Sequence, residues 1–236
     1  MLEHLRHYQK VQGHCESILD EIKKIIQPGK SELDLVNECF AIISSHGITD
    51  FWYHGVPAII AIGEHTSLSL SGKDYVPSSD NTLQEHDFLT IDLSLAIDHY
   101  WGIRARSFYI ENGVMVNRPF CPMQSYIEDS IRSLHQYLKE IAEPDMTFHD
   151  LYHFINEKVM SLNLLHLDFK HNFGHSIEKK LEDRVYIADG IYDKITPTTL
   201  FSFEPHLKEK NSFYGVKDAD IYYFDKGRAK RVRELG

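Results

Sequence analysis

The sequence has few cysteines, no long apolar run and little positive charge. Cys15, Cys39 and Cys121 lie far apart and form no CxxC pair, which argues against a disulfide framework and against a zinc finger. No apolar run approaches the ~20 residues of a membrane-spanning helix, and the charged N-terminus lacks the apolar core of a signal peptide. We therefore expect a cytoplasmic protein that does not enter the membrane.

The net charge of the 236-residue chain is −10. This charge disfavours nucleic acid and anionic membranes as partners, because both require clusters of basic side chains. Hydrophobic residues make up 42% of the chain and charged residues 25%, which are the proportions of an ordinary folded protein. No stretch resembles a linker, so residues 1–236 are expected to form a single domain.

Apolar residues recur every three or four positions in four segments, as they do in amphipathic helices. Ser31 with Asp34, and Thr147, are expected to cap the second and fourth of these helices. Short strand-like segments follow each pair of helices, and proline and glycine interrupt those of the last third. The order of helices, strands, helices and strands predicts an α+β fold of two similar halves. The predicted helices cover residues 5–26, 31–47, 119–141 and 147–162.

The strongest strand signal is a hairpin over residues 83–110. Apolar residues dominate its first strand, and Asp92 is the one acid in the middle of that strand. A buried carboxylate loses several kcal/mol of hydration unless a cation, a proton or hydrogen-bond donors meet it. After a turn at Asp98–Gly102, Arg104 and Arg106 share one face of the second strand. We expect Asp92 to lie on one face of this hairpin with both guanidinium groups close by.

Two further polar residues, His175 and Glu204, lie in otherwise strand-like sequence. Together with Asp92 they make a set of carboxylate, imidazole and carboxylate, which is a metal-ligand set if the three side chains converge. A single buried histidine or glutamate is more often a hydrogen-bonded core residue than a ligand. Their spacing in the sequence does not show whether they converge.

Five stretches, in the same order, resemble the M24 family, which has the pita-bread or creatinase fold of methionine aminopeptidases, aminopeptidase P, prolidase and creatinase. The resemblance runs from about Leu5 to Tyr223. It implies an α+β pita-bread fold with two pseudo-symmetric αββ-type halves around a curved antiparallel sheet. The five stretches are YHGVP from Tyr53, DFLTIDLSLA from Asp87, FGHSI from Phe173, FSFEPHL from Phe201 and GVKDADIYYF from Gly215.

The resemblance implies a site in which two aspartates, one histidine and two glutamates hold two metal ions. Asp92, His175 and Glu204 match the first aspartate, the histidine and the first glutamate. The second aspartate falls on Ile103 and the last glutamate falls on Ala219. Both carboxylates that bridge the metals in the family are therefore missing, and a standard two-metal centre is not expected.

Two family histidines are also absent, since their positions fall near Leu70 and on Glu182. A bulge or a shift of one residue would allow other side chains to replace the missing ligands. Without replacements, the three matching residues would hold a single divalent ion of Mn, Fe, Co or Zn, or none. The candidate replacements are Asp98, His99, Asp218 and Asp220.

The creatinase-like members implied by the resemblance act without metal. In that case His175 would shuttle a proton, and Glu204 would orient it or bind a cationic group of the substrate. Arg104 and Arg106 are candidates to clamp a substrate carboxylate. Further candidates for substrate contact are Tyr53, His54 and Trp101.

Three functions remain open at this point. The first is a hydrolase or lyase that acts on a C–N bond of a small amino-acid derivative or peptide, with Asp92, His175 and Glu204 as its central residues. The second is a non-catalytic domain that binds a peptide or protein in the same groove. The third is a metal-dependent aminopeptidase with substituted ligands. A homodimer is compatible with each of them.

Overall fold

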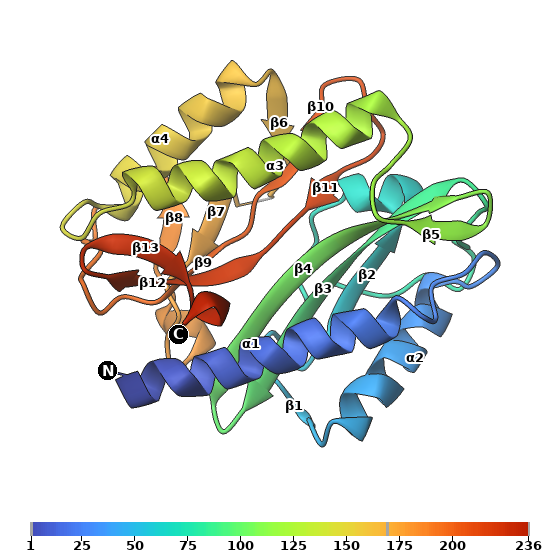
Figure 1. The fold of residues 1–236 in the computed structure, drawn as a ribbon, viewed down its shortest axis with the longest axis horizontal. Coiled ribbons are helices and arrows are strands. Elements are labelled where there is room, and N and C mark those ends of the chain that lie inside the picture. Colours follow the sequence, from blue (N-terminus) through green and yellow to red (C-terminus); the bar gives the residue numbers. More distant parts are fainter. Residues whose placement is uncertain (1, 169, 236) are drawn as a thin grey trace.

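Long helices and long strands make up the first half of the chain, and short strands dominate the second half after its two helices (Figure 1). The computed structural model describes residues 2–168 and 170–235. The first half contains α1 (Leu2–Ile22), α2 (Glu32–Ser45), β1 (Asp50–Phe51), β2 (Ala58–Ile62), η1 (Gly63–Ser67), β3 (Asp87–Ile97), β4 (Tyr100–Glu111) and β5 (Val114–Val116). The second half contains α3 (Pro122–Ile141), α4 (Phe148–Ser161), β6 (Leu164–His166), β7 (Asn172–His175), η2 (Leu181–Asp183), β8 (Tyr186–Ala188), β9 (Phe201–Phe203), β10 (His206–Glu209), β11 (Val216–Lys217), β12 (Asp220–Asp225), β13 (Arg228–Arg231) and η3 (Val232–Glu234).

The β3–β4 hairpin forms the centre of a five-stranded antiparallel sheet. Strands β1 and β2 pair with β3, and β5 pairs with the far end of β4. The turn of the hairpin is shorter than predicted, because Asp98 and His99 adopt left-handed φ angles of 50° and 68° and close it with two residues. The register places Asp92 opposite Ala105. Three smaller sheets, β11–β10–β6, β13–β12–β9 and β7–β8, belong to the second half.

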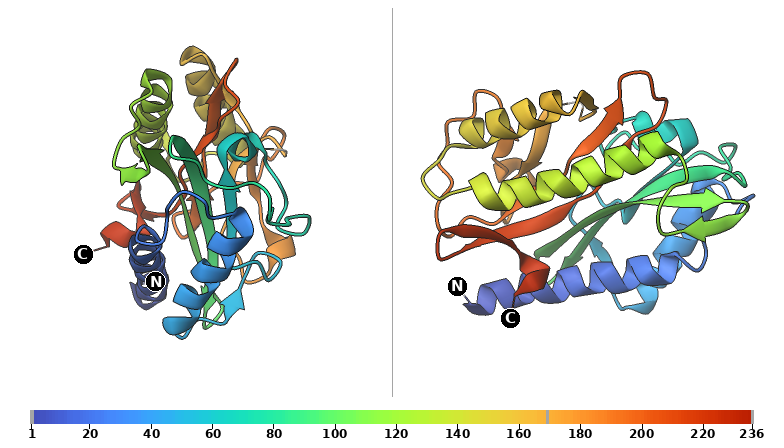
Figure 2. Two further views of the ribbon diagram at one scale, coloured as in Figure 1. Left: turned by 90° about the vertical axis from the view of Figure 1, so that its right-hand side faces the viewer. Right: turned by 45° about the horizontal axis from the view of Figure 1, so that its top comes forward.

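Capping residues and apolar faces explain the helices. Ser31 with Asp34 forms a capping box at the start of α2, and Thr147 with Asp150 forms one at the start of α4. Helix α1 ends at Ile22, four residues before the predicted end. Figure 2 shows that α1 and α3 lie on the same side of the long strands. The helices of each half cover their own hydrophobic core, one built on α1, α2, β2 and β3 and the other on α3, α4 and the short strands.

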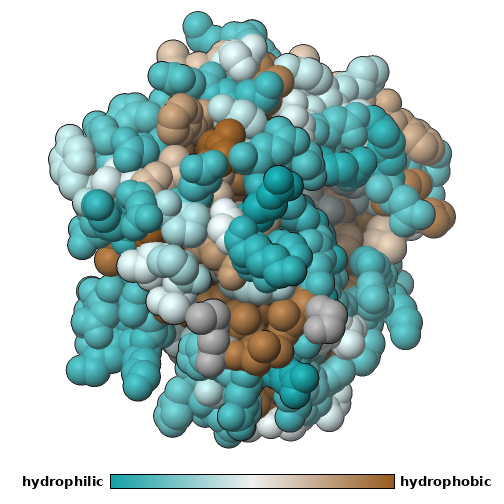
Figure 3. Space-filling view, turned by 60° about the vertical axis from the view of Figure 1, so that its left-hand side comes forward, coloured by the Kyte–Doolittle hydropathy of each residue, from teal (hydrophilic) through white to brown (hydrophobic). Residues whose placement is uncertain are grey.

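The surface shown in Figure 3 is mostly hydrophilic, with a local hydrophobic patch among hydrophilic residues. This agrees with the 25% of charged residues in the sequence. Within the described part of the chain, no helix combines the length and the apolar character that crossing a membrane requires.

Candidate active site

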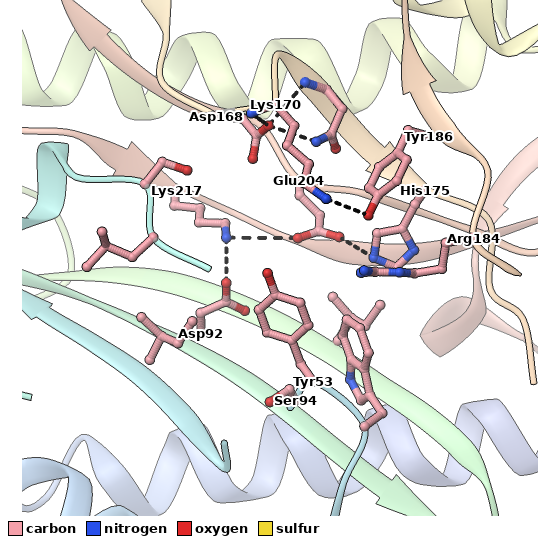
Figure 4. Close-up of a pocket in the computed structure, with 16 residues that line it drawn as sticks. Tyr53, Asp92, Ser94, Asp168, Lys170, His175, Arg184, Tyr186, Glu204 and Lys217 are labelled. Atoms are coloured by element: carbon pink, nitrogen blue, oxygen red, sulfur yellow. Dashed lines mark hydrogen bonds and ion pairs between the residues drawn. The ribbon is translucent and has the colours of Figure 1, made fainter. Parts of the chain in front are cut away.

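A pocket of about 90 Å³ lies where the β3–β4 hairpin faces the short strands of the second half (Figure 4). Asp92 enters it from β3, His175 from β7 and Lys217 from β11, while Glu204 directly follows β9. Three residues that sequence reasoning selected therefore meet in one cavity. The full lining is Trp52, Tyr53, Ile59, Ser69, Leu70, Asp92, Ser94, Ile103, Asp168, Lys170, Asn172, His175, Arg184, Tyr186, Glu204 and Lys217.

The cation that Asp92 requires is Lys217. Its Nζ donates a hydrogen bond to Asp92 Oδ2 at 2.5 Å and lies 3.9 Å from Glu204 Oε2. Burial lowers the pKa of Lys217, but the two facing carboxylates outweigh burial and raise this pKa above its usual value. Burial raises the pKa of Asp92, and the ammonium opposes that shift. Lys217 is therefore a permanent positive charge between two carboxylates at neutral pH.

His175 is a neutral imidazole with one nitrogen directed at Glu204. Its Nδ1 lies 2.8 Å from the carbonyl oxygen of Ser176, and this contact requires the proton to be on Nδ1. The lone pair of Nε2 then faces Glu204 Oε1 at 3.5 Å. Burial lowers the pKa of His175 to about 4 against the opposing effect of Glu204. Nε2 is therefore able to accept a proton or a hydrogen bond from a bound molecule.

Ser202 and Gly174 hold these two side chains together. The Ser202 hydroxyl donates to Glu204 Oε1 at 2.6 Å and accepts from the backbone N–H of His175 at 3.1 Å. Burial raises the pKa of Glu204, but His175, Lys217 and Ser202 outweigh it and leave this pKa below its usual value. Gly174 has a φ of 137°, and a Cβ there would lie 2.2 Å from the Ser202 carbonyl oxygen. Glycine thus allows the close approach of β7 to β9.

Apolar side chains occupy the two positions at which the M24 resemblance expects metal ligands and the position near which it expects a further histidine. Ile103 lies opposite Ser94 in the hairpin and lines the pocket, as does Leu70. Ala219 is fully buried and pairs with Ala105 of β4. Neither isoleucine nor alanine offers a lone pair to a cation, so neither side chain can serve as the carboxylate that the resemblance expects at its position.

The four candidate replacement ligands lie elsewhere. Asp98 and His99 are exposed at the tip of the hairpin. Asp218 forms ion pairs with Arg104 and Arg106, and Asp220 is fully buried against α1 and the C-terminal segment, where it accepts from Gln12 and Arg233. None of these four residues is among the residues that line the described pocket.

The expectation that Arg104 and Arg106 lie close to Asp92 is wrong. Because Asp92 pairs with Ala105, it is Ala105 that shares the face of Asp92, and the two arginines project from the opposite face. Arg104 is fully buried there and donates to Glu16, to Asp218 and to the Ala219 carbonyl oxygen. Neither guanidinium group reaches the pocket, so neither is available to clamp a substrate in it.

The aromatic candidates divide between the pocket and its surroundings. Tyr53 lines the pocket as expected. His54 does not, because its φ of 55° places it on an exposed turn with its ring against Tyr53. Trp101 lies behind the pocket, where it stacks on Trp52 at 4.7 Å and lies 6.3 Å from the His175 ring. Trp101 therefore supports the wall without forming it.

Sequence reasoning missed Lys217 and Arg184. Lys217 lies in the quoted stretch GVKDADIYYF, where a lone lysine inside strand-like sequence was the available signal. The Arg184 guanidinium lies 5.3 to 5.7 Å from the ring centroids of Trp52, Tyr53 and Tyr186. No pattern in the sequence marked Arg184, since it follows the short turn η2 and depends on tertiary contacts for its place. Glu182, at the position of a family histidine, is exposed.

Comparisons with known proteins agree with this architecture. The profile of metallopeptidase family M24 matches residues 6–227. A methionine aminopeptidase of Buchnera aphidicola is 23% identical over 201 residues, which cover 82% of this chain and 71% of that protein. The solved prolidase of Pyrococcus furiosus superposes with a TM-score of 0.80 at 19% identity, over 100% of this chain and 65% of that one.

A methionine aminopeptidase of Thermotoga maritima superposes with a TM-score of 0.77 at 14% identity, over 100% of this chain and 98% of that one. At such identities the structures show the fold alone, and they confirm the predicted α+β pita-bread fold. The chain spans less than two thirds of the prolidase and 62% of an X-Pro aminopeptidase of Thermotoga maritima.

Proposed function

The chain belongs to metallopeptidase family M24, and from this premise we propose that it is a metal-independent hydrolase that cleaves a C–N bond in a small amino-acid derivative or short peptide. The observation that carries the proposal is the position of Lys217 Nζ, 2.5 Å from Asp92 Oδ2 and 3.9 Å from Glu204 Oε2. In this proposal the ammonium supplies the positive charge that divalent ions supply in the peptidases of the family.

The residues of the pocket do not fit the divalent ions that the family implies. Asp92 is already neutralised by Lys217, and a dication beside the ammonium would meet a like charge at close range. The ligand positions on Ile103 and Ala219 are apolar. Among the described residues that line the pocket, no further histidine or carboxylate than Asp92, His175, Glu204 and Asp168 is present. We therefore derive no catalytic step through a metal ion.

Water attack on a bound carbonyl group is the step that these side chains support. His175 Nε2 accepts the proton of the attacking water as the oxygen bonds to the carbonyl carbon. The Lys217 ammonium donates to the carbonyl oxygen as negative charge develops there. The imidazolium then returns its proton to the leaving nitrogen as the C–N bond breaks. Asp92 positions Lys217, and Glu204 stabilises the imidazolium.

The size of the pocket and the Arg184 guanidinium in its lining favour a small substrate that carries a carboxylate. A volume of about 90 Å³ excludes a long peptide from the enclosed part of the pocket. Arg184 directs its Nε to the Leu181 carbonyl oxygen at 2.8 Å, and its remaining N–H groups are suited to a substrate carboxylate. This assigns to Arg184 the role that the sequence suggested for Arg104 and Arg106.

The test is turnover of a panel of N-acyl amino acids and dipeptides by the full chain in the presence of EDTA. We expect turnover to persist with the chelator, and we expect His175→Ala to lower kcat/KM by about 10²- to 10⁴-fold. His86→Ala, which changes an exposed histidine outside the pocket, is the matched control and should leave turnover unchanged. Turnover that EDTA abolishes and added metal restores would refute the proposal.

A non-catalytic binding role is the second candidate, and the low basicity of His175 favours it. An imidazole with a pKa of about 4 is a weak base at neutral pH. Under this alternative the same panel would bind, as calorimetry would detect, and none of it would be cleaved. Loss of binding in Arg184→Met without any turnover in the wild-type chain would favour this second role.

A further inference from the structure

A second cluster of metal-ligand side chains lies outside the pocket, at the junction of α4 with the end of β8. His149 and His153 are one helical turn apart on α4, and Asp189 follows β8 directly. Among the described residues these three form the group whose possible ligand atoms all lie within 4.8 Å of one another. We propose that His149, His153 and Asp189 bind a zinc ion.

The distances suit a tetrahedral ion. Asp189 Oδ1 lies 2.9 Å from His153 Nε2 and 3.1 Å from His149 Nδ1. Ligand atoms around tetrahedral zinc, with bonds of about 2.0–2.1 Å, are separated by about 3.3 Å. Small side-chain movements would therefore bring all three atoms to bonding distance, and His149 Nδ1 would then bind zinc in place of the Gly190 N–H.

The contact between His149 Nδ1 and Asp189 Oδ1 has no hydrogen atom between its two atoms when His149 accepts from Gly190. The backbone N–H of Gly190 donates to His149 Nδ1 at 3.1 Å, so this nitrogen carries its lone pair. The same nitrogen lies 3.1 Å from Asp189 Oδ1, which is also an acceptor. His153 can donate to the carboxylate, but His149 cannot do so while it accepts from Gly190. A cation between Nδ1 and the carboxylate would turn this contact between two acceptors into an attractive one.

The chemistry of the donors selects zinc. Two imidazole nitrogens and one carboxylate suit Zn²⁺, whereas Mg²⁺ and Ca²⁺ prefer sites made entirely of oxygen. The His153 side chain is 45% exposed and that of Asp189 is 69% exposed, so an ion can enter from solvent and keep water at its open position. An ordinary hydrogen-bonded surface cluster accounts for the His153 contact, and zinc would also make the His149 contact attractive.

Zinc at this position would join two parts of the structure that support the pocket. Asp189 lies three residues after Tyr186, which lines the pocket from β8. The backbone of His149 already donates to the Ile191 carbonyl oxygen at 2.8 Å, so the turn after β8 rests on the start of α4. Three ligands from these two elements would fix this junction more firmly, and we expect thermal stability to increase with zinc.

The test is calorimetric titration of ZnCl₂ into the chelator-treated full chain, with thermal unfolding as a second readout. We expect about one equivalent of zinc per chain and a rise in Tm. His153→Ala and Asp189→Asn should each weaken binding by at least ~10-fold, because each removes one ligand. MgCl₂ at the same concentration should leave Tm unchanged.

Two control variants separate this site from the pocket and from general binding to surface histidines. His175→Ala should keep the zinc site, because His175 lies in the pocket, and His86→Ala should keep it as well. Asp189→Asn retains the shape of the side chain, so a loss of zinc binding in a folded Asp189→Asn chain reports on the ligand itself. Absence of zinc binding in the wild-type chain, or equal affinity in wild type and His153→Ala, would overturn the proposal.

Discussion

The two halves of the molecule divide the work of the site unequally. The first half contributes Asp92 from the long, regular hairpin β3–β4, whose strands run over Asp87–Ile97 and Tyr100–Glu111. The second half contributes His175, Glu204 and Lys217 from strands or strand ends of two to four residues. The first half therefore contributes one carboxylate from a long strand, and the second contributes an imidazole, a carboxylate and an ammonium group from short strands.

Buried histidines mark the same division. Burial lowers the pKa of His175 to about 4, that of His166 and His206 to about 3, and that of His135 well below its usual value. All four belong to the second half. The comparison teaches that the second half buries neutral histidines, while the buried charged side chains of the first half, Glu32 and Arg104, are held by hydrogen bonds and ion pairs.

The largest predicted effect is a loss of folding stability at acidic pH, and the buried histidines of the second half cause it. A histidine with a lowered folded pKa binds a proton more readily when unfolded, so its contribution to stability is complete above pH 6.5 and is lost as the pH falls below this value. Each of the four histidines should lower the free energy of unfolding by about 1.4 kcal/mol per pH unit between 6.5 and its folded pKa. Urea unfolding at pH 7, 6 and 5 measures this loss.

Hydrogen exchange at pH 5 would locate the loss within the molecule. We expect amides of β6, β7, β9 and β10 to lose protection before those of β3 and β4, because the buried histidines lie beside the short strands. Equal stability at pH 7 and pH 5, or earlier exchange in the β3–β4 hairpin, would contradict the prediction that acid destabilises the second half first.

A smaller but more local effect should come from the ion pairs that join the halves. Arg104 is fully buried in the first half and pairs with Asp218 of the second, whereas the Arg106 side chain is 27% exposed beside the same carboxylate. Arg104→Met removes the hydrogen bonds that a fully buried guanidinium group donates to Glu16, Asp218 and the Ala219 carbonyl oxygen, and should lower the free energy of unfolding by about 3–5 kcal/mol. Arg106→Met should lower it by about 1 kcal/mol or less.

Urea unfolding of the two variants at pH 7 makes this comparison, with each arginine serving as the control for the other. Equal losses in both variants would mean that burial does not set the strength of this contact. Turnover or ligand binding in Arg106→Met should remain at the wild-type level, since Arg106 points away from the pocket.

Periodicity was enough to predict the first half from the sequence. The capping box at Ser31 and the long hairpin both follow from local patterns that the structure confirms. Asp92 stood out because a lone acid in an apolar strand requires a partner. The prediction that Arg104 and Arg106 lie close to Asp92 was wrong, because the length of the turn sets the pairing register. The turn has two residues instead of the predicted five, and this register puts both arginines on the face opposite Asp92.

Less of the second half could be predicted from its sequence, and the reason is physical. Most of its strands have two to four residues, which is too short for a clear period-two pattern, and their places depend on contacts between distant residues. His175 and Glu204 were selected as polar residues in apolar surroundings. Lys217 and Arg184 could be assigned to the site only from tertiary contacts, which bring Lys217 to Asp92 and Arg184 to Tyr53. The Lys217 ammonium, on which the proposal of a metal-free site rests, could therefore not be assigned to the site from local sequence patterns.

The central claim is that Lys217 takes the place of divalent ions between Asp92 and Glu204. Titration of Mn²⁺ into a chelator-treated chain, followed by electron paramagnetic resonance, tests it most directly, with His153→Ala present in all samples to remove the α4 cluster. We predict no bound Mn²⁺ while Lys217 is present, and about one equivalent after Lys217→Ala frees both carboxylates. About one or two equivalents bound with Lys217 in place, and lost on His175→Ala, would contradict the claim.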